Sequence, residues 1–388
     1  MHRLKTFLKQ YLILAGVSVH FAFAGAYVLA PEQLREVYYR GCSLLETKIP
    51  LFKFAFSLRE SGLSVAEEIK LNFGEWLPLP VDAKNQIEGI WVNGESVFSL
   101  SHASRVLKNG DVLKIGAGTY TQPLVIKAND VTVIGVGHVV IKQASAEGKG
   151  AIITKGNNTK IINIECREIR VRDRNGACVR HEGENLTLSH VYFHHSEQGL
   201  LTGRWAGTVL IEDSRFEQLG LNGRAHGIYV DGGELIIRNS MILAGKNEGH
   251  EVKSRAAITI IENSVIASFS SKDSRLIDIP DGGTLIVRGS VLQMGVGSSN
   301  QDLIGYGLEN RKYPVNQVKL HDNLIIMERR GVNTLFHGHP SLPKLQADQN
   351  IIISEIPPAI EGLNFMFSSR AEAGLEAHPM LPKIDPKN

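Results

Sequence analysis

The sequence lacks several features that often reveal a function directly. Its 42 lysines and arginines almost balance its 40 aspartates and glutamates, so the formal net charge is only +2. Such a balance gives no reason to expect nucleic acid as a partner, because nucleic-acid-binding domains usually carry a basic excess. Aromatic residues make up only 7% of the chain, whereas glycine is frequent, with 38 residues. This composition suits a fold of many short strands and turns.

Cysteine is also scarce. Cys42, Cys166 and Cys178 form no Cys-x-x-Cys motif and no disulfide framework, and their odd number makes a disulfide staple unexpected. The chain has no Gly-x-Ser-x-Gly elbow and no phosphate-binding loop, so nothing indicates serine-hydrolase or nucleotide chemistry. The pair His337 and His339 is too isolated to predict a metal site.

The N-terminus carries one long hydrophobic run. Basic residues from His2 to Lys9 precede an uncharged stretch, residues 11–30, which is long enough to span a bilayer because a spanning helix needs about 20 apolar residues. The stretch also fits a signal peptide cut after Ala24 or Ala26, and a buried core helix is the third interpretation. Anchor and signal peptide both predict export. We therefore expect a periplasmic or otherwise extracytoplasmic protein, attached to the inner membrane if the segment is retained.

The composition changes along the chain. Ser64 with Glu67 forms a capping-box pattern inside a helical stretch, and the sequence from Leu77 to Pro80 ends that stretch. Beyond Gly94, short β-branched runs alternate with glycine, asparagine and aspartate. The sequence therefore predicts four parts: residues 1–30 as signal peptide or anchor, 31–80 as helical segment and linker, 90–355 as a repetitive β-domain, and 356–388 as an irregular tail.

The β-domain contains a repeat. In each unit one apolar residue, here called the anchor, precedes a polar pair, and successive anchors are 23 to 26 residues apart. The predicted anchors are Ile164, Leu188, Ile211, Ile237, Ile261 and Val287, and Leu320 opens a longer unit. Five residues after an anchor comes a second apolar residue: Phe193, Phe216, Ile242, Ile266, Leu292 and Ile325. A period of this size is typical of stacked supersecondary units.

The pattern favours a β-solenoid over other repeats. Leucine-rich repeats need a Leu-x-x-Leu-x-Leu frame, and helical repeats need long amphipathic stretches; both are absent. Short strands with inward apolar residues and polar corners fit coils that stack about 4.8 Å apart and share one core. The sequence therefore predicts an all-β domain.

Four stretches resemble a known family. Gly110–Tyr120 looks like the first rung of many right-handed parallel β-helices, and 175–180, 199–203 and 249–256 resemble bacterial members of the pectate-lyase-like group. The resemblance covers roughly residues 97–353. It implies a right-handed parallel β-helix, which would follow the N-terminal helical or membrane segment described above. It implies the reaction only weakly, because a fold does not fix a function.

Alignment of the units on their anchors predicts surface columns, because successive side chains of a strand point to opposite faces. The residues eight before each anchor should point outward: Arg180, Gly203, Tyr229, Lys253 and Ile279. The residues six before should do the same: Glu182, Trp205, Asp231, Arg255 and Asp281. The residues nine before are mostly apolar and should point inward: Val179, Thr202, Ile228, Val252 and Asp278. The last unit looks slipped by one residue, which would turn Asp278 outward beside Lys253.

This face would suit a sugar chain. Gly203 would leave a notch in it, Trp205 would stack on a pyranose ring, and the cations would hold carboxylates. His226 and His250, eleven before their anchors, lie at its edge. Glu197, at a turn, is a further candidate for sugar binding.

One hypothesis is a polysaccharide lyase or C5-epimerase that acts on an acidic, uronate-containing polysaccharide. Both reactions begin with removal of the C5 proton, which requires that the uronate carboxylate be neutralised. Arg180 or Arg255 would neutralise it, Lys253 or His250 would be the base, and Tyr229 the acid. His226 and Asp278 are further catalytic candidates. No cofactor is expected, and assistance by Ca²⁺ is left open.

The competing hypothesis is a non-catalytic carbohydrate-binding or scaffold protein in exopolysaccharide export or assembly. Each site residue also has a structural interpretation. Arg255 would complete an ion ladder with Asp231 and Asp281, and the histidines would only hydrogen-bond the backbone. Hydrolases with this fold use a cluster of aspartates that includes an adjacent pair, and this chain has no such pair.

Overall fold

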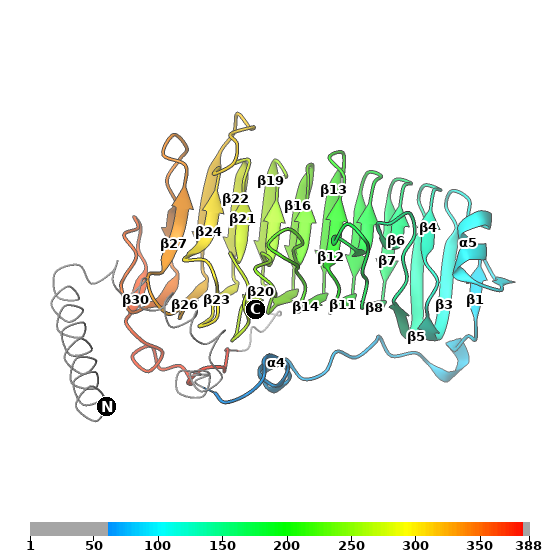
Figure 1. The fold of residues 1–388 in the computed structure, drawn as a ribbon, viewed down its shortest axis with the longest axis horizontal. Coiled ribbons are helices and arrows are strands. Elements are labelled where there is room, and N and C mark those ends of the chain that lie inside the picture. Colours follow the sequence, from blue (N-terminus) through cyan, green and yellow to red (C-terminus); the bar gives the residue numbers. More distant parts are fainter. Residues whose placement is uncertain (1–60, 383–388) are drawn as a thin grey trace, which may run out of the picture.

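The computed structural model describes residues 61–382, so the predicted signal peptide or anchor and most of the predicted helical segment lie outside the described residues. The described chain winds into about nine coils that stack along the long axis of the molecule (Figure 1). Each typical coil gives one strand to a nine-stranded parallel sheet, sheet B, and two strands to a larger, bent sheet, sheet A. The predicted all-β, right-handed parallel β-helix is therefore confirmed.

Sheet B contains one strand per coil, and neighbouring strands are hydrogen-bonded in chain order. Its strands are β4 (Leu124–Ile126), β6 (Gly150–Thr154), β9 (Ala177–His181), β12 (Gln198–Thr202), β15 (Ile228–Val230), β18 (Val252–Ser254), β21 (Ile277–Ile279), β24 (Asp302–Tyr306) and β27 (Thr334–Gly338).

Sheet A begins with β1 (Ile90–Val92) and β2 (Glu95–Val97), followed by the long strands β3 (Val112–Tyr120) and β5 (Thr132–Lys142). Its first column then continues through β7 (Thr159–Ile162), β10 (Leu186–Ser189), β13 (Thr208–Glu212), β16 (Glu234–Arg238), β19 (Ile258–Glu262), β22 (Thr284–Arg288), β25 (Gln317–His321) and β28 (Gln346–Asp348). Its second column comprises β8 (Glu165–Arg167), β11 (Tyr192–His194), β14 (Arg215–Glu217), β17 (Met241–Leu243), β20 (Val265–Ala267), β23 (Val291–Met294), β26 (Leu324–Met327), β29 (Ile351–Ser354) and β30 (Phe365–Phe367).

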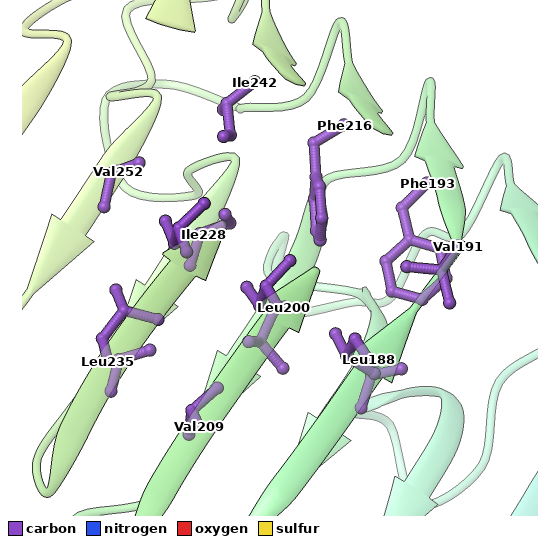
Figure 2. Close-up of a cluster of buried hydrophobic side chains, with 14 of the residues drawn as sticks. Leu188, Val191, Phe193, Leu200, Val209, Phe216, Ile228, Leu235, Ile242 and Val252 are labelled. Carbon is purple, nitrogen blue, oxygen red and sulfur yellow. The ribbon is translucent and has the colours of Figure 1, made fainter. Parts of the chain in front are cut away.

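The predicted anchors form one buried ladder. Leu188, Ile211, Ile237, Ile261 and Val287 are direct partners from strand to strand, and none is exposed. Figure 2 shows how inward side chains of neighbouring coils meet in the core. This stacking supplies each coil with the apolar contacts that it cannot make alone.

One anchor was wrong by three residues. Leu188 pairs with Ile161, not with Ile164. Ile164 follows the corner residue Asn163, as Val191 follows His190 one coil later. Ile161 is followed by Ile162 and Asn163, so the polar pair that marks an anchor is missing from this coil.

The polar residues at the end of each strand of the first column have a structural role. The residue after each strand of the first column turns the corner in the left-handed region, as with Asp213 (φ 49°) and Asn239 (φ 47°), where short polar side chains are tolerated. The next residue is a buried serine, and the backbone N–H of Ser214 donates to the hydroxyl of Ser240 at 3.1 Å. The same bond links Ser240 to Ser264. The corners thus satisfy their buried backbone groups from coil to coil.

Helices cover two parts of the solenoid. Helix α5 (Leu100–Val106) packs beside β1 and β4 at the first coil (Figure 1). A short 3-10 turn, η1 (Ala83–Asn85), precedes β1. Helix α4 (Val65–Phe73) has the capping box predicted at Ser64 and Glu67. Its residue Ile69 packs against outward apolar residues of the second column, among them Val265 and Val291. Within residues 61–382, no helix is long and apolar enough to cross a membrane.

A buried ionic network ties α4 to the C-terminal tail. The carboxylate of Glu68 lies 3.2 Å from Nε2 of His378, and Nδ1 of His378 lies 3.7 Å from Glu328. Burial works against each charge, but a hydrogen bond to His378 lowers the pKa of Glu68 to about 2. Hydrogen bonds to Arg370 and His378 lower the pKa of Glu328 to about 2, and the two glutamates raise that of His378 to about 9. The network is therefore fully charged from weakly acidic to neutral pH.

This network predicts how docking of α4 depends on pH. The contribution of His378 is complete below pH 6.5 and is lost as the pH rises through about 9, and the contribution of the two glutamates is lost as the pH falls from 4.5 through about 2. We expect proteolysis between α4 and β1 to be slowest near pH 5–6.5. His378→Gln should remove the alkaline part of this profile, whereas His321→Gln, at an exposed histidine, should leave it unchanged. An unchanged alkaline limb in His378→Gln would contradict the assignment.

The cysteines differ from expectation. Cys166 and Cys178 form a disulfide, and both are buried. Cys166 lies in β8 and Cys178 in β9, which is the next strand along the chain. The prediction of no disulfide was wrong because an odd count is compatible with one pair and one remaining cysteine.

Candidate functional site

The outward column of sheet B is the candidate site. Its register runs from Arg180 through Leu201, Tyr229, Lys253, Asp278 and Gly305 to His337. The predicted slip that turns Asp278 outward beside Lys253 is confirmed. The predicted notch at Gly203 was wrong, because Leu201 takes that place. The turn after β12 is longer than its neighbours, so Leu201 precedes its anchor Ile211 by ten residues, whereas Tyr229 precedes Ile237 by eight. The same turn explains why Leu200, not Thr202, pairs with Val179 and Ile228.

Lys253 lies between two carboxylates. Its Nζ is 3.2 Å from Asp278 and 2.8 Å from Glu309. Lys253 is only 9% exposed and Asp278 only 2%. Arg275 also pairs with Asp278, at 3.1 Å, and with Asp302, at 2.9 Å. Lys253 is thus an almost buried side chain held by two carboxylates, and its removal would leave both carboxylates without this partner.

Arg255 lies next to this pair and connects it to Tyr229. Its Nε donates to the hydroxyl of Tyr229 at 3.0 Å, and its two terminal nitrogens donate to Asp281 and Glu309. Asp231 is 4.0 Å from Nε, so the ladder predicted from the sequence is present, with one close and one distant member. Burial opposes the charge of Arg255, but hydrogen bonds to Glu309 and Tyr229 raise its pKa, so it stays charged.

The two histidines at the edge are stacked, with ring centroids 4.8 Å apart and planes inclined by 13°. Nδ1 of His226 accepts the backbone N–H of His250, and Nδ1 of His250 accepts that of Arg275, both at 3.1 Å. Burial lowers the pKa of His250 to about 3 and that of His226 well below its usual 6.5. Both rings are therefore neutral and carry their proton on Nε2. A ring whose acceptor nitrogen is already used by the backbone is a poor general base, which argues against His250 in that role.

The remaining predicted site residues lie at different places. Trp205 is in the turn after β12 and is 77% exposed, available to solvent beside the column. Nε of Arg180 lies 3.6 Å from Glu182. Glu197 is buried and accepts the backbone N–H groups of Val171 and Gly176 at 3.1 and 2.7 Å, so it orders the turn before β9.

Sequence reasoning missed Glu309. It lies in the loop between β24 and β25, inside the long coil that separates Val287 from its partner Leu320 by 33 residues. No repeat position marks it. The length of that coil is the one sequence signal that could have drawn attention to this loop. Extra residues in a solenoid form loops that lie on one face, often the face that binds a ligand.

A second polar cluster lies on the outward face of sheet A. Glu165 is 2.6 Å from His138 and 3.2 Å from His194. Trp76, in the extended segment after α4, stacks on Tyr192 with ring centroids 5.6 Å apart. Because this segment already contacts that surface, the outward column of sheet B is the better candidate for a ligand. Among residues 61–382, no group of three or more His, Cys, Asp or Glu side chains is arranged to hold a metal ion.

Comparison of the sequence with protein-family models and with curated proteins gave no match. Among solved structures, the pectate lyase Pel9A is similar with 14% identity and a TM-score of 0.45, over 74% of this chain and 76% of that one. A Geobacillus virus E2 protein, ORF18, is similar with 12% identity and a TM-score of 0.38, over 69% of this chain and 54% of that one. The stacked parallel strands themselves show a parallel β-helix. The low identities and TM-scores of these two structures give no information about the reaction of this protein.

Proposed function

We propose that this protein is a carbohydrate-active β-helix that removes the C5 proton of uronate residues in an acidic polysaccharide, as a lyase or a C5-epimerase. The observation that carries the proposal is the hydrogen bond of 3.0 Å from Arg255 to the hydroxyl of Tyr229, beside Lys253 on the same outward face. It places a potential base next to two cations.

Two cations near Tyr229 would make removal of the C5 proton easier. The C5 proton is only weakly acidic, because its removal adds negative charge beside a carboxylate that is already negative. Lys253 and Arg255 would contact that carboxylate and stabilise the charge as it develops. Both are held by carboxylates of the chain, so they are fixed in place before a ligand arrives.

Tyr229 is the base in this proposal, which reverses the roles first expected for Tyr229 and Lys253. The phenol oxygen of Tyr229 accepts a hydrogen bond from Arg255, a cation that would stabilise negative charge on this oxygen. The phenolate takes the C5 proton. In a lyase the C4–O bond then breaks as the C4–C5 double bond forms, and the phenol returns the proton to the leaving oxygen. In an epimerase C5 instead takes a proton from solvent on the opposite face, and the phenol of Tyr229 then returns its proton to solvent.

The location is part of the proposal. The disulfide between Cys166 and Cys178 supports an exported protein, because disulfides persist mainly in oxidising compartments. Together with the N-terminal hydrophobic stretch, it favours the periplasm or the cell surface, with attachment to the inner membrane as the further expectation.

A second candidate function is carbohydrate binding without catalysis, for example in exopolysaccharide export or assembly. The observation in its favour is that Lys253, Arg255 and Arg275 each already pair with carboxylates of the same chain. Ion pairs of this kind order the side chains of a surface whether or not a reaction takes place there.

One experiment separates the two. The full-length protein is incubated with polymers of galacturonate, glucuronate and mannuronate–guluronate, with a neutral glucan as control, in EDTA and in Ca²⁺. A lyase produces unsaturated ends that absorb in the ultraviolet, and an epimerase changes the uronate composition. Either change with one uronate polymer supports the first function. Binding without chemical change supports the second, and neither binding nor change with any polymer contradicts both.

A further inference from the structure

Glu309 contacts both cations of the site at once. One carboxylate oxygen lies 2.8 Å from Nζ of Lys253, and the other accepts from a terminal nitrogen of Arg255. This two-point contact is the arrangement expected for the carboxylate of a bound acidic sugar. The side chain that makes it comes from a loop, whereas both cations come from sheet B and the turn that follows it.

The loop that carries Glu309 lies over the edge of the site. The backbone N–H groups of Glu309 and Asn310 donate to the carbonyl of Pro280 at 3.1 and 2.9 Å. The hydroxyl of Tyr313 donates to the carbonyl of Arg255 at 2.6 Å. These bonds hold the backbone of the loop in place, while the Glu309 side chain itself is 50% exposed. The carboxylate can therefore exchange its partners for water without disturbing the core.

We propose that Lys253 and Arg255 form a subsite for the carboxylate of a ligand, and that Glu309 occupies this subsite as a built-in competitor until a ligand displaces it. The inference rests on the proposed function and deepens it, because it names the group of the ligand that is recognised and the step that must precede binding.

The partners of the two cations support displacement. Without Glu309, Lys253 still contacts Asp278, and Arg255 still contacts Asp281 and the Tyr229 hydroxyl. The cations would keep their positions and present two free N–H directions to one incoming carboxylate. Exchange of one carboxylate for another leaves the local charge unchanged. A neutral sugar that displaced Glu309 would leave those two contacts without a negative partner, so the subsite selects acidic ligands.

Competition by Glu309 persists at all physiological pH values. Burial favours the protonated form, but the hydrogen bonds from Lys253 and Arg255 outweigh it and lower the pKa of Glu309 to about 2. The competitor is therefore always charged, and only a ligand or a substitution removes it.

The test compares the affinity of full-length variants for a uronate trisaccharide by calorimetry. Glu309→Gln keeps the size of the side chain and removes its charge, so it should bind roughly tenfold more tightly than the natural protein, whose apparent affinity is reduced in proportion to the fraction of molecules with an open subsite. Tyr313→Phe removes a tether of the loop and should also tighten binding. Glu361→Gln removes a charge from a remote exposed ion pair and should change nothing.

The outcomes distinguish the inference from the function on which it rests. If the natural protein binds the uronate and Glu309→Gln binds it with equal or lower affinity, Glu309 is not a competitor, while the proposed function stands. If neither binds any uronate oligomer, the proposed function fails and the inference fails with it. Tighter binding of a neutral trisaccharide by Glu309→Gln, to the same extent, would overturn the carboxylate subsite. Thermal unfolding of each variant confirms that the affinities refer to folded protein.

Discussion

Tyr229→Phe is expected to lower turnover of the uronate polymer by about 10²–10⁴-fold, the usual effect of the loss of a positioned proton-transfer group. The variant loses one hydroxyl, which accepts a hydrogen bond from Arg255. Arg255 keeps Asp281 and Glu309, so the midpoint of thermal unfolding should hardly change. Initial rates with the polymer that the natural protein converts provide the measurement.

The matched control is Tyr120→Phe. Tyr120 also uses its hydroxyl for one hydrogen bond, to the carbonyl of Gly116 at 2.8 Å, but it lies in the first coil, far from the column. Its substitution should leave turnover intact. Equal activity of Tyr229→Phe and the natural protein would rule out Tyr229 as the base.

Lys253→Ala is a less clean test than the sequence alone suggested. An outward residue of a solenoid usually contributes little to stability, so an exposed lysine would be a harmless deletion. Lys253 is instead almost buried between Asp278 and Glu309, and its removal leaves Asp278 with Arg275 as its close partner. Loss of both activity and stability is therefore expected from that variant, which is why Tyr229 carries the test.

Ile237→Asp should prevent folding. Ile237 has no exposed surface and lies in the middle of the anchor ladder, in register with Ile211 and Ile261. An unpaired carboxylate at this place costs several kcal/mol, a large part of the roughly 5–15 kcal/mol that stabilises a typical domain. The expected result is insoluble protein, or soluble protein without the circular dichroism of strands.

Ile258→Asp is the corresponding control. Ile258 lies on the next coil but points outward and is 38% exposed. The same substitution there should cost about 1 kcal/mol or less. If Ile237→Asp folds as well as Ile258→Asp, the interpretation of the repeat as a core ladder is wrong.

The fold could be predicted from the sequence because each coil obtains a hydrophobic core only by stacking on its neighbours. That requirement imposes an inward apolar residue at a nearly constant spacing, which is why the anchors from Leu188 to Val287 were found in correct register. The same rule located Asp278 beside Lys253. It failed where the spacing varies, as with Leu201 before a longer turn, and where the polar pair is incomplete, as with Ile161, which Ile162 follows.

Much of the site could not be predicted by spacing. Glu309 reaches Lys253 and Arg255 from an inserted loop, and a repeat pattern says nothing about where an insertion folds. The protonation of His250 depends on which nitrogen the backbone of Arg275 contacts, and that contact exists only in three dimensions. The periodic part of the chain could be predicted, and the non-periodic part could not.

The most direct test of the proposed function is hydrogen exchange at C5. The full-length protein is incubated in D₂O with each uronate oligomer, and the C5 proton is followed by nuclear magnetic resonance. Lyase and epimerase both remove this proton, so with one oligomer its signal should disappear in the presence of the natural protein and persist with Tyr229→Phe. An oligomer that binds saturably yet keeps its full C5 signal, across the whole panel, would contradict catalysis at this site.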